Sequence, residues 1–140
     1  MANETRVEIA SSIDIVSARQ QGRALAQKLG FTGSQSTLIT AAISEVARNI
    51  VDYARHGEII MAGMQDGSKH GIKIVARDEG PGIPDIAQAM QYGYSTRKSL
   101  GVGLPGAKWL MDEFDIESQL GKGTTVTMKK WTGHFGYQDH

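Results

Sequence analysis

The sequence predicts an α+β fold, a two-layer α/β sandwich built on a mixed, mainly antiparallel sheet. Three observations lead to this fold class. The residue patterns give five strands and three or four helices, several strands follow one another through short polar turns, and no repeat or linker divides the chain. Short turns join antiparallel strands whereas parallel strands need long crossovers, so a doubly wound parallel sheet is excluded.

The first part of the chain reads as a short strand followed by two helices. Residues 6–9 alternate between polar and apolar side chains, which predicts an edge strand. Ser11 or Ser12 offers an N-cap for a helix that Gly30 ends. A second helix is expected over residues 34–55. Its apolar stripe and closing glycine are Ile39, Ile43, Val46, Ile50, Tyr53 and Gly57.

The rest of the chain reads as two hairpins separated by a region rich in glycine. The polar stretch 66–69 and the glycines of 121–123 predict the two hairpin turns, and residues 78–84 form a turn dense in glycine and proline. The expected elements are strands at 58–64 and 72–77, a short helix near 85–91, a loop at 93–103, a helix near 104–112, and strands at 115–119 and 124–130.

Composition and charge limit the classes of function. The 140 residues fit one domain, expected over residues 1–131, and residues 132–140 are expected to be a disordered tail. Because the chain has no cysteine, disulfides, thiolate metal sites and cysteine nucleophiles are excluded. Fifteen basic and fifteen acidic residues give no net charge, which argues against nucleic acid as a partner. No apolar run approaches the ~20 residues of a membrane span and no signal peptide is recognisable, so we expect a cytoplasmic protein without a membrane partner.

Glycine is concentrated in one part of the chain, where six of the 17 glycines lie between residues 80 and 106. Gly101, Gly103 and Gly106 satisfy the G-x-G-x-x-G pattern, but no strand precedes them and no acid follows about 20 residues later, so a dinucleotide fingerprint is excluded. A P-loop is excluded because Ile116 stands where its first glycine is required. Glycines before a helix still allow backbone amides to approach a phosphate at the helix N-terminus.

Two polar side chains share one flank of the second predicted helix. Glu45 and Asn49 are spaced i, i+4, so a carboxylate and a carboxamide project from the same face. An amide oxygen suits Mg²⁺ that keeps several waters and is otherwise held by phosphate oxygens. A carboxylate one turn away could accept a proton from an attacking hydroxyl. The pair therefore predicts phosphate chemistry.

Four motifs, taken in order, resemble the ATP-site motifs of the GHKL superfamily, which includes DNA gyrase, MutL and the histidine kinases and shares a Bergerat-type fold. They are Glu45-x-x-x-Asn49, Asp78-x-Gly80-x-Gly82, Gly101-x-Gly103-x-x-Gly106 and Gly123-Thr124. Within the superfamily, the chain is similar to the serine/threonine kinases of the bacterial stressosome, which are related to the anti-sigma-factor kinases. This closer likeness rests on residues 13–19, 43–50, 79–85, 110–114 and 125–131, and the resemblance as a whole covers about residues 5–131.

The resemblance implies how the motif residues would bind MgATP. Asn49 would ligate the Mg²⁺ that bridges the phosphates, and Glu45 would be the base or would orient the substrate hydroxyl. Asp78 would accept a hydrogen bond from the adenine amino group, which favours ATP over GTP. Gly80 and Gly82 would keep the purine slot open.

The remaining motif residues would hold the triphosphate and the base. The triphosphate would be cradled by Gly101, Gly103 and Gly106. Thr124 would contact the base side, directly or through water, and residues 93–100 would form a short ATP lid. The lid carries adjacent cations, Arg97 and Lys98, which we expect to contact the γ-phosphate because phosphoryl transfer depends mainly on positioning and charge neutralisation.

The resemblance implies an ATP- and Mg²⁺-dependent protein serine/threonine kinase. Its substrates would be STAS-domain proteins of a stressosome (the RsbS and RsbR type). Phosphorylation would release the kinase, which would then bind and activate a PP2C-type phosphatase (the RsbU type) by partner switching. The alternative is an anti-sigma-factor kinase that binds a sigma factor directly and is antagonised by a STAS protein. Both share the nucleotide site, so the motifs do not separate them.

Overall fold

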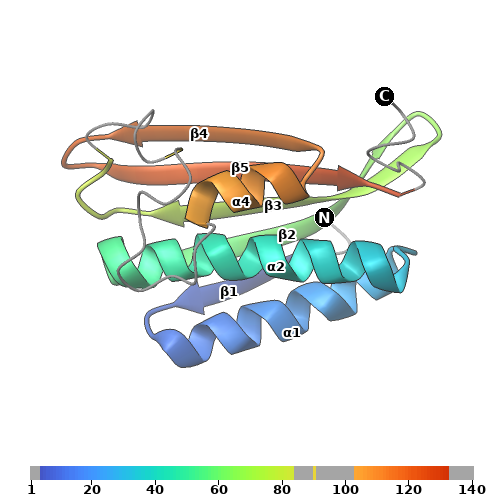
Figure 1. The fold of residues 1–140 in the computed structure, drawn as a ribbon, viewed down its shortest axis with the longest axis horizontal. Coiled ribbons are helices and arrows are strands. Elements are labelled where there is room, and N and C mark those ends of the chain that lie inside the picture. The colour runs from blue at the N-terminus through green and yellow to red at the C-terminus, as the bar shows by residue number, and fades with distance from the viewer. Residues whose placement is uncertain (1–3, 84–89, 91–102, 133–140) are drawn as a thin grey trace.

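The computed structural model describes residues 4–83, 90 and 103–132, and within them five strands form one sheet that helices cover on one face (Figure 1). The helices are α1 Ser12–Lys28, α2 Gly33–Asn49, the π-helical turn η1 Ile50–Ala54 and α4 Gly103–Leu110. The strands are β1 Thr5–Ile9, β2 Gly57–Asp66, β3 Lys69–Asp78, β4 Glu113–Gln119 and β5 Gly123–Trp131. The predicted α+β sandwich is confirmed. Of the helices in these ranges, none has the length and apolar character needed to cross a membrane.

The strands lie side by side in the order β1-β2-β3-β5-β4, and every neighbouring pair is antiparallel. The sequence predicts a mixed, mainly antiparallel sheet, whereas the described strands pair antiparallel throughout. The reason is the strand order: β5 inserts between β3 and β4, which run in the same direction, and β2 separates β1 from β3. Strands of equal direction therefore do not become neighbours in the described sheet.

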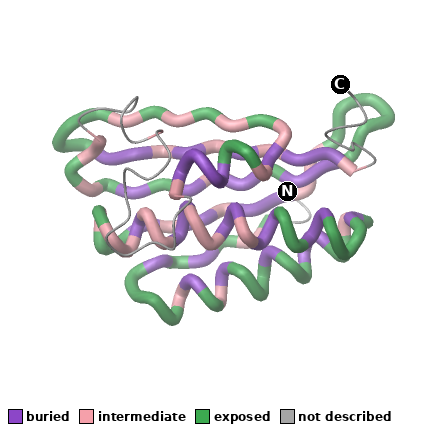
Figure 2. The backbone as a smooth tube through the Cα atoms, in the orientation of Figure 1, coloured by how far each residue is buried: buried purple, intermediate pink, exposed green. Residues whose placement is uncertain are grey.

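The hydrophobic core fills the space between the sheet and the helices, so one face of the strands is buried (Figure 2). Helices α1 and α2 approach closely at Gly22, where a Cβ would collide with the Ile43 side chain. Strand β5 alternates buried and half-buried residues over most of its length. Its buried row consists of Thr124, Val126, Met128 and Lys130. A polar residue therefore stands at each end of this inner row.

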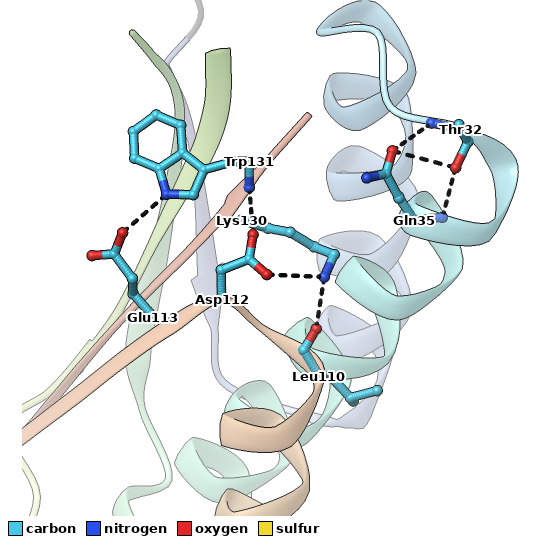
Figure 3. Close-up of polar contacts among 7 residues, drawn as sticks. All are labelled: Thr32, Gln35, Leu110, Asp112, Glu113, Lys130 and Trp131. Carbon is cyan, nitrogen blue, oxygen red and sulfur yellow. Dashed lines mark hydrogen bonds and ion pairs between the residues drawn. The ribbon is translucent and has the colours of Figure 1, made fainter. Parts of the chain in front are cut away.

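The first two helices begin and end at residues that the sequence marks. Ser11 is the N-cap of α1, and its backbone N–H donates to the Asp14 carboxylate at 3.1 Å. Gly30 takes a φ of 95°, which favours glycine and ends the helix as predicted. Thr32 caps α2: its Oγ1 accepts the Gln35 backbone N–H at 3.1 Å, and the Gln35 side chain accepts the Thr32 N–H (Figure 3).

The helix predicted over residues 34–55 is divided in the structure. Helix α2 ends at Asn49, and η1 continues as a π turn, in which hydrogen bonds reach five residues back. Arg55, not Gly57, ends this segment: its φ is 71°, and its N–H donates to the first carbonyl of η1 at 2.7 Å. The wider turn rotates the side chains that follow Asn49 around the helix axis. Tyr53, predicted in the apolar stripe, is therefore 41% exposed. Gly57 instead begins β2.

The strands extend further than the sequence predicts. Strands β2 and β3 have ten residues each and pair as far as Asp66 and Lys69, which leaves a two-residue turn at 67–68. Strand β4 begins two residues earlier than expected, because α4 ends at Leu110. The helix predicted near 85–91, the loop predicted at 93–103 and the tail at 132–140 lie outside the described residues, apart from residues 90, 103 and 132.

Candidate functional site

One row of residues crosses the whole sheet at the end where β3 stops. In strand order its members are Ile9, Gly57, Asp78, Thr124 and Ser118, each directly opposite the next. Side chains of directly opposite residues in antiparallel strands lie on the same face. The row therefore gathers a carboxylate and two hydroxyls, beside a glycine at position 57. A Cβ there would lie 3.0 Å from Ile50 of η1, so glycine allows η1 to approach the sheet.

Asp78 is the last residue of β3, and its carboxylate is held by two backbone groups. Its Oδ1 accepts the Gly80 N–H at 2.9 Å and the Thr124 N–H at 3.3 Å. The residue is only 9% exposed. Within the described part of the chain, the hydrogen bonds that the Asp78 carboxylate accepts both end on Oδ1. This arrangement fixes the carboxylate and leaves Oδ2 as an acceptor for a ligand.

The glycines around Asp78 stand where no other residue fits. A Cβ at Gly80 would lie 2.6 Å from the Cβ of Ala54 in η1. Gly82 has a φ of 83°, and a Cβ there would collide with the carbonyl of Gln119. Gly123, at φ 121°, packs directly against the backbone of Asp78. These positions let the segment after β3 lie against both η1 and the β4–β5 turn, which brings three backbone segments around one carboxylate.

Ser118 also belongs to this group, although it lies outside the four sequence motifs and was not predicted as a site residue. Its Oγ accepts the Ile83 N–H at 2.7 Å, and it lies 3.2 Å from the Gly123 carbonyl and 2.8 Å from Thr124 Oγ1. The signal that could have found it is the alternation of β4, in which Phe114 and Ile116 precede it on the same face. A hydroxyl at an inward position of a strand requires partners, and here it has three.

Glu45 and Asn49 lie together near the end of α2, and both are half-buried. Glu45 Oε1 is buried, and no described residue forms a hydrogen bond with it. Burial raises the pKa of Glu45 above its ordinary value of 4.5, while the Arg48 charge and the Gly103 backbone N–H act in the opposite direction. Gly103 is the first residue of α4, so the carboxylate of α2 lies at the N-terminal end of α4. A buried carboxylate with a raised pKa is typical of proton-transfer sites.

The other end of α4 is fixed to β5 by a buried ion pair (Figure 3). Lys130 is 5% exposed, donates to the Leu110 carbonyl at 3.1 Å and lies 3.6 Å from Asp112 Oδ1. Asp112 Oδ2 accepts the Trp131 backbone N–H at 2.8 Å. The ammonium thus satisfies a carbonyl at the C-terminal end of the helix, where a cation is favourable. Helix α4 is tied to the sheet at one end and meets the α2 carboxylate at the other.

Comparison with known proteins places these features in a family. Residues 10–130 match the family of histidine kinase-like ATPase domains. The chain belongs to this family. It is 50% identical over 131 residues to the serine/threonine-protein kinase RsbT of Bacillus subtilis (strain 168), an alignment that covers 94% of this chain and 98% of the relative. The prediction of an ATP-binding serine/threonine protein kinase with a GHKL fold is confirmed at this level.

The chain is also similar, at lower identity, to proteins named anti-sigma F factor. The anti-sigma F factor of Thermoanaerobacter sp. is 35% identical over 122 residues, with 83% of this chain and 84% of the relative covered. That of Geobacillus stearothermophilus is 32% identical over 139 residues, with 93% of each chain covered. Among solved structures, a nucleotide-free catalytic domain of histidine kinase ThkA is 12% identical, with 90% of this chain and 96% of that chain covered and a TM-score of 0.47.

The structure brings the predicted ATP-site residues together in two groups. One contains Asp78, Gly80, Gly82 and Thr124. The other contains Glu45, Asn49 and Gly103. Gly106 is buried in α4 and does not belong to either group of described contacts. Arg97, Lys98 and Gly101 lie outside the described residues, so their roles stay predictions.

The second group fits a magnesium ion that is bound together with nucleotide phosphates. Asn49 offers a neutral amide oxygen one helical turn from the Glu45 carboxylate. Mg²⁺ keeps several waters and takes one or two protein oxygens plus substrate phosphates, so a small donor set suits it. Across the described ranges, no cluster of three or more histidine, aspartate or glutamate side chains could hold a metal ion.

Proposed function

We propose that the chain is a cytoplasmic, ATP- and Mg²⁺-dependent serine/threonine protein kinase whose adenine subsite is the group around Asp78. The observation that carries this proposal is the Asp78 carboxylate: backbone N–H groups of Gly80 and Thr124 hold Oδ1. Oδ2 then accepts a hydrogen bond from the adenine amino group, and Thr124 contacts the base side. Gly80 and Gly82, which the family resemblance assigns to the purine slot, let the segment after β3 pack closely against Ala54 and the Gln119 carbonyl beside this carboxylate.

The phosphates lie, in this proposal, at the N-terminal end of α4. A helix N-terminus presents unpaired backbone N–H groups and a positive dipole end, both of which favour phosphate. Gly103 is the first residue there, and Gly101 and Gly106 complete the predicted cradle. Asn49 would hold Mg²⁺, which would supply positive charge to neutralise the phosphates. Arg97 and Lys98 of the predicted lid contact the γ-phosphate.

Glu45 is the base of the proposed transfer. The substrate hydroxyl oxygen forms a bond to the γ-phosphorus, the bond between that phosphorus and the β–γ bridging oxygen breaks, and ADP leaves with the electron pair. The hydroxyl proton passes to Glu45. Its raised pKa supports this role, because a carboxylate with a higher pKa is a stronger base and its buried oxygen has no partner among the described residues.

The proposed substrates are STAS-domain proteins of the RsbS and RsbR type in a stressosome. Phosphorylation of these proteins releases the kinase, which then binds and activates a PP2C-type phosphatase of the RsbU type. The 50% identity to RsbT over nearly the whole chain supports this assignment. The alternative is an anti-sigma-factor kinase that binds a sigma factor directly, and the relatives named anti-sigma F factor support it at 32–35% identity.

The experiment that tests the proposal combines the protein with MgATP and an RsbS-type STAS protein of the same organism. Intact mass spectrometry reads phosphate on the STAS protein, and calorimetry reads ATP binding. We expect one phosphate on serine or threonine, which is lost in Asn49→Ala. Phosphorylation should be retained in the control Gln65→Ala, which removes an exposed carboxamide from the β2–β3 hairpin. Failure to bind ATP contradicts the proposal. ATP binding without transfer, together with a stable sigma-factor complex, favours the alternative.

A further inference from the structure

We propose that Ser118 is a specificity-determining positioning residue: its hydroxyl fixes the proton of the Thr124 hydroxyl, so that the base subsite offers only acceptors to the group at C6 of the purine. This inference rests on the proposed function, because it assumes that a purine nucleotide binds beside Asp78. It concerns a residue outside the four motifs of the family.

The Ser118 hydroxyl of β4 lies between three partners from two other segments. Its Oγ is 2.7 Å from the Ile83 nitrogen, 3.2 Å from the Gly123 carbonyl oxygen and 2.8 Å from Thr124 Oγ1. Ile83 lies in the segment after β3, and the other two residues begin β5. Ser118 itself is directly opposite Thr124 in the register of β4 and β5. One side chain of β4 therefore connects the segment after β3 to the start of β5 beside Asp78.

A hydroxyl can donate one hydrogen bond and accept two, and this count decides the proton positions. The Ile83 N–H donates to Ser118 Oγ. The Gly123 carbonyl has no proton, so that contact is a hydrogen bond only if Ser118 donates. The contact with Thr124 is then a hydrogen bond only if Thr124 donates. One proton assignment thus satisfies all three contacts, and it uses up the proton of Thr124.

The consequence concerns the nucleotide base. With its proton directed at Ser118, Thr124 presents lone pairs, as does Asp78 Oδ2. Two acceptors match the amino group of adenine, which carries two N–H donors, either directly or through a water. They oppose the carbonyl oxygen that hypoxanthine and guanine carry at the same position. Without Ser118, the Thr124 hydroxyl can rotate and donate to such a carbonyl.

The test compares ATP with ITP, which has a carbonyl at C6 and a proton on N1 in place of the adenine amino group. Calorimetry gives the ratio of the ITP and ATP dissociation constants for the wild type, Ser118→Ala and Ser118→Thr. We expect the ratio to fall about tenfold in Ser118→Ala, the scale of one hydrogen bond to a ligand, and to be retained in Ser118→Thr, which keeps the hydroxyl. Thr125→Ala, next to Thr124 on the opposite face of β5, is the control and leaves the ratio unchanged.

A second comparison separates positioning from a loss of packing. In a Thr124→Val background, which removes the hydroxyl that Ser118 orients, Ser118→Ala should have no further effect on the ratio. An unchanged ratio in Ser118→Ala, or an equal effect of that substitution in the Thr124→Val background, overturns the inference and leaves the proposed kinase in place. A wild type that binds neither nucleotide overturns the proposed function, and this inference with it.

Discussion

Asp78 and Thr124 face each other across β3 and β5, and the aspartate Oδ1 accepts the threonine backbone N–H at 3.3 Å. The same oxygen accepts the Gly80 N–H at 2.9 Å, so the carboxylate is oriented before any ligand arrives. Preorganised groups do not have to be ordered at the moment of binding, which favours affinity. The hydrogen bond from the Gly80 N–H also requires the chain to turn directly after Asp78, and glycine fits this turn.

Asp78→Asn tests the adenine contact without removing the turn. The asparagine carbonyl can keep both backbone hydrogen bonds, but an NH₂ donor replaces the acceptor Oδ2. We expect ATP affinity to fall about 10–100-fold, the range for a hydrogen bond to a charged group, with little change in the thermal midpoint. Calorimetry and thermal melting check this. Glu79→Gln, an exposed carboxylate one residue away, is the control and should bind ATP normally.

Gly80→Ala tests the close approach of the turn to η1. The new methyl would lie 2.6 Å from the Ala54 Cβ, so we expect a loss of about 1–3 kcal/mol in the free energy of unfolding, as for other overpacked sites. Chemical denaturation measures it. Gly33→Ala is the matched control, because nothing lies within 4 Å of a Cβ there, and it should be neutral or slightly stabilising. Equal effects at both glycines would refute the packing explanation.

Lys130→Met tests the buried ion pair that fixes the end of α4. Removing the ammonium leaves the Asp112 carboxylate buried with less compensation, which costs about 3–5 kcal/mol of unfolding free energy. The neighbouring Lys129 pairs with Glu113 at 3.8 Å near the surface, so Lys129→Met should cost less than about 1 kcal/mol. Denaturant titrations of the two variants give the comparison. Similar losses would show that the buried pair does not stabilise this junction.

Glu45→Gln separates activity from stability. Loss of the base should lower phosphoryl transfer at least about 100-fold, measured as initial rates on the STAS substrate. Stability should change in the opposite direction. Because burial raises the pKa of Glu45 in the folded state, the folded protein binds the proton more tightly than the unfolded chain, so the ionised carboxylate opposes folding above the raised pKa.

The stability difference between Glu45→Gln and the wild type should depend on pH, because the pKa of Glu45 is raised in the folded protein. At neutral pH, Glu45→Gln should melt at a higher temperature than the wild type. The difference should narrow as the pH falls towards the ordinary value of 4.5, where the wild-type carboxyl is protonated in the folded protein. Melting curves across this range provide the measurement. A Glu45→Gln protein that is less stable at pH 7 would indicate that the favourable interactions of the carboxylate with the Gly103 N–H and Arg48 outweigh the cost of its burial.

Local sequence signals predicted the start and end of α1 and the turn that follows Asp78. Gly30 ends α1 because its positive φ is a local requirement, and Asp78 with Gly80 forms its turn from residues two apart in the chain. The π turn η1 was not predicted, because Tyr53 continues the helical spacing of apolar residues and only the packed structure changes its phase. Residue patterns report local geometry, and tertiary contacts decide where that geometry is interrupted.

The other features that the sequence did not predict depend on contacts between segments far apart in the chain. The antiparallel pairing throughout the described sheet depends on β5 entering between β3 and β4, which no local pattern specifies. Ser118 is 35 residues from its partner Ile83, so its role emerges only when the strand order is known. The same holds for Lys130, whose partner carbonyl belongs to Leu110, 20 residues earlier.

The most direct test of the proposed nucleotide site is a crystal structure of the protein with Mg²⁺ and a non-hydrolysable ATP analogue. We predict that the adenine amino group lies within hydrogen-bond distance of Asp78 Oδ2. We also predict that the phosphates lie at the N-terminal end of α4, with the metal ion ligated by Asn49. A nucleotide bound elsewhere, or an adenine that does not contact Asp78, would contradict the proposed site.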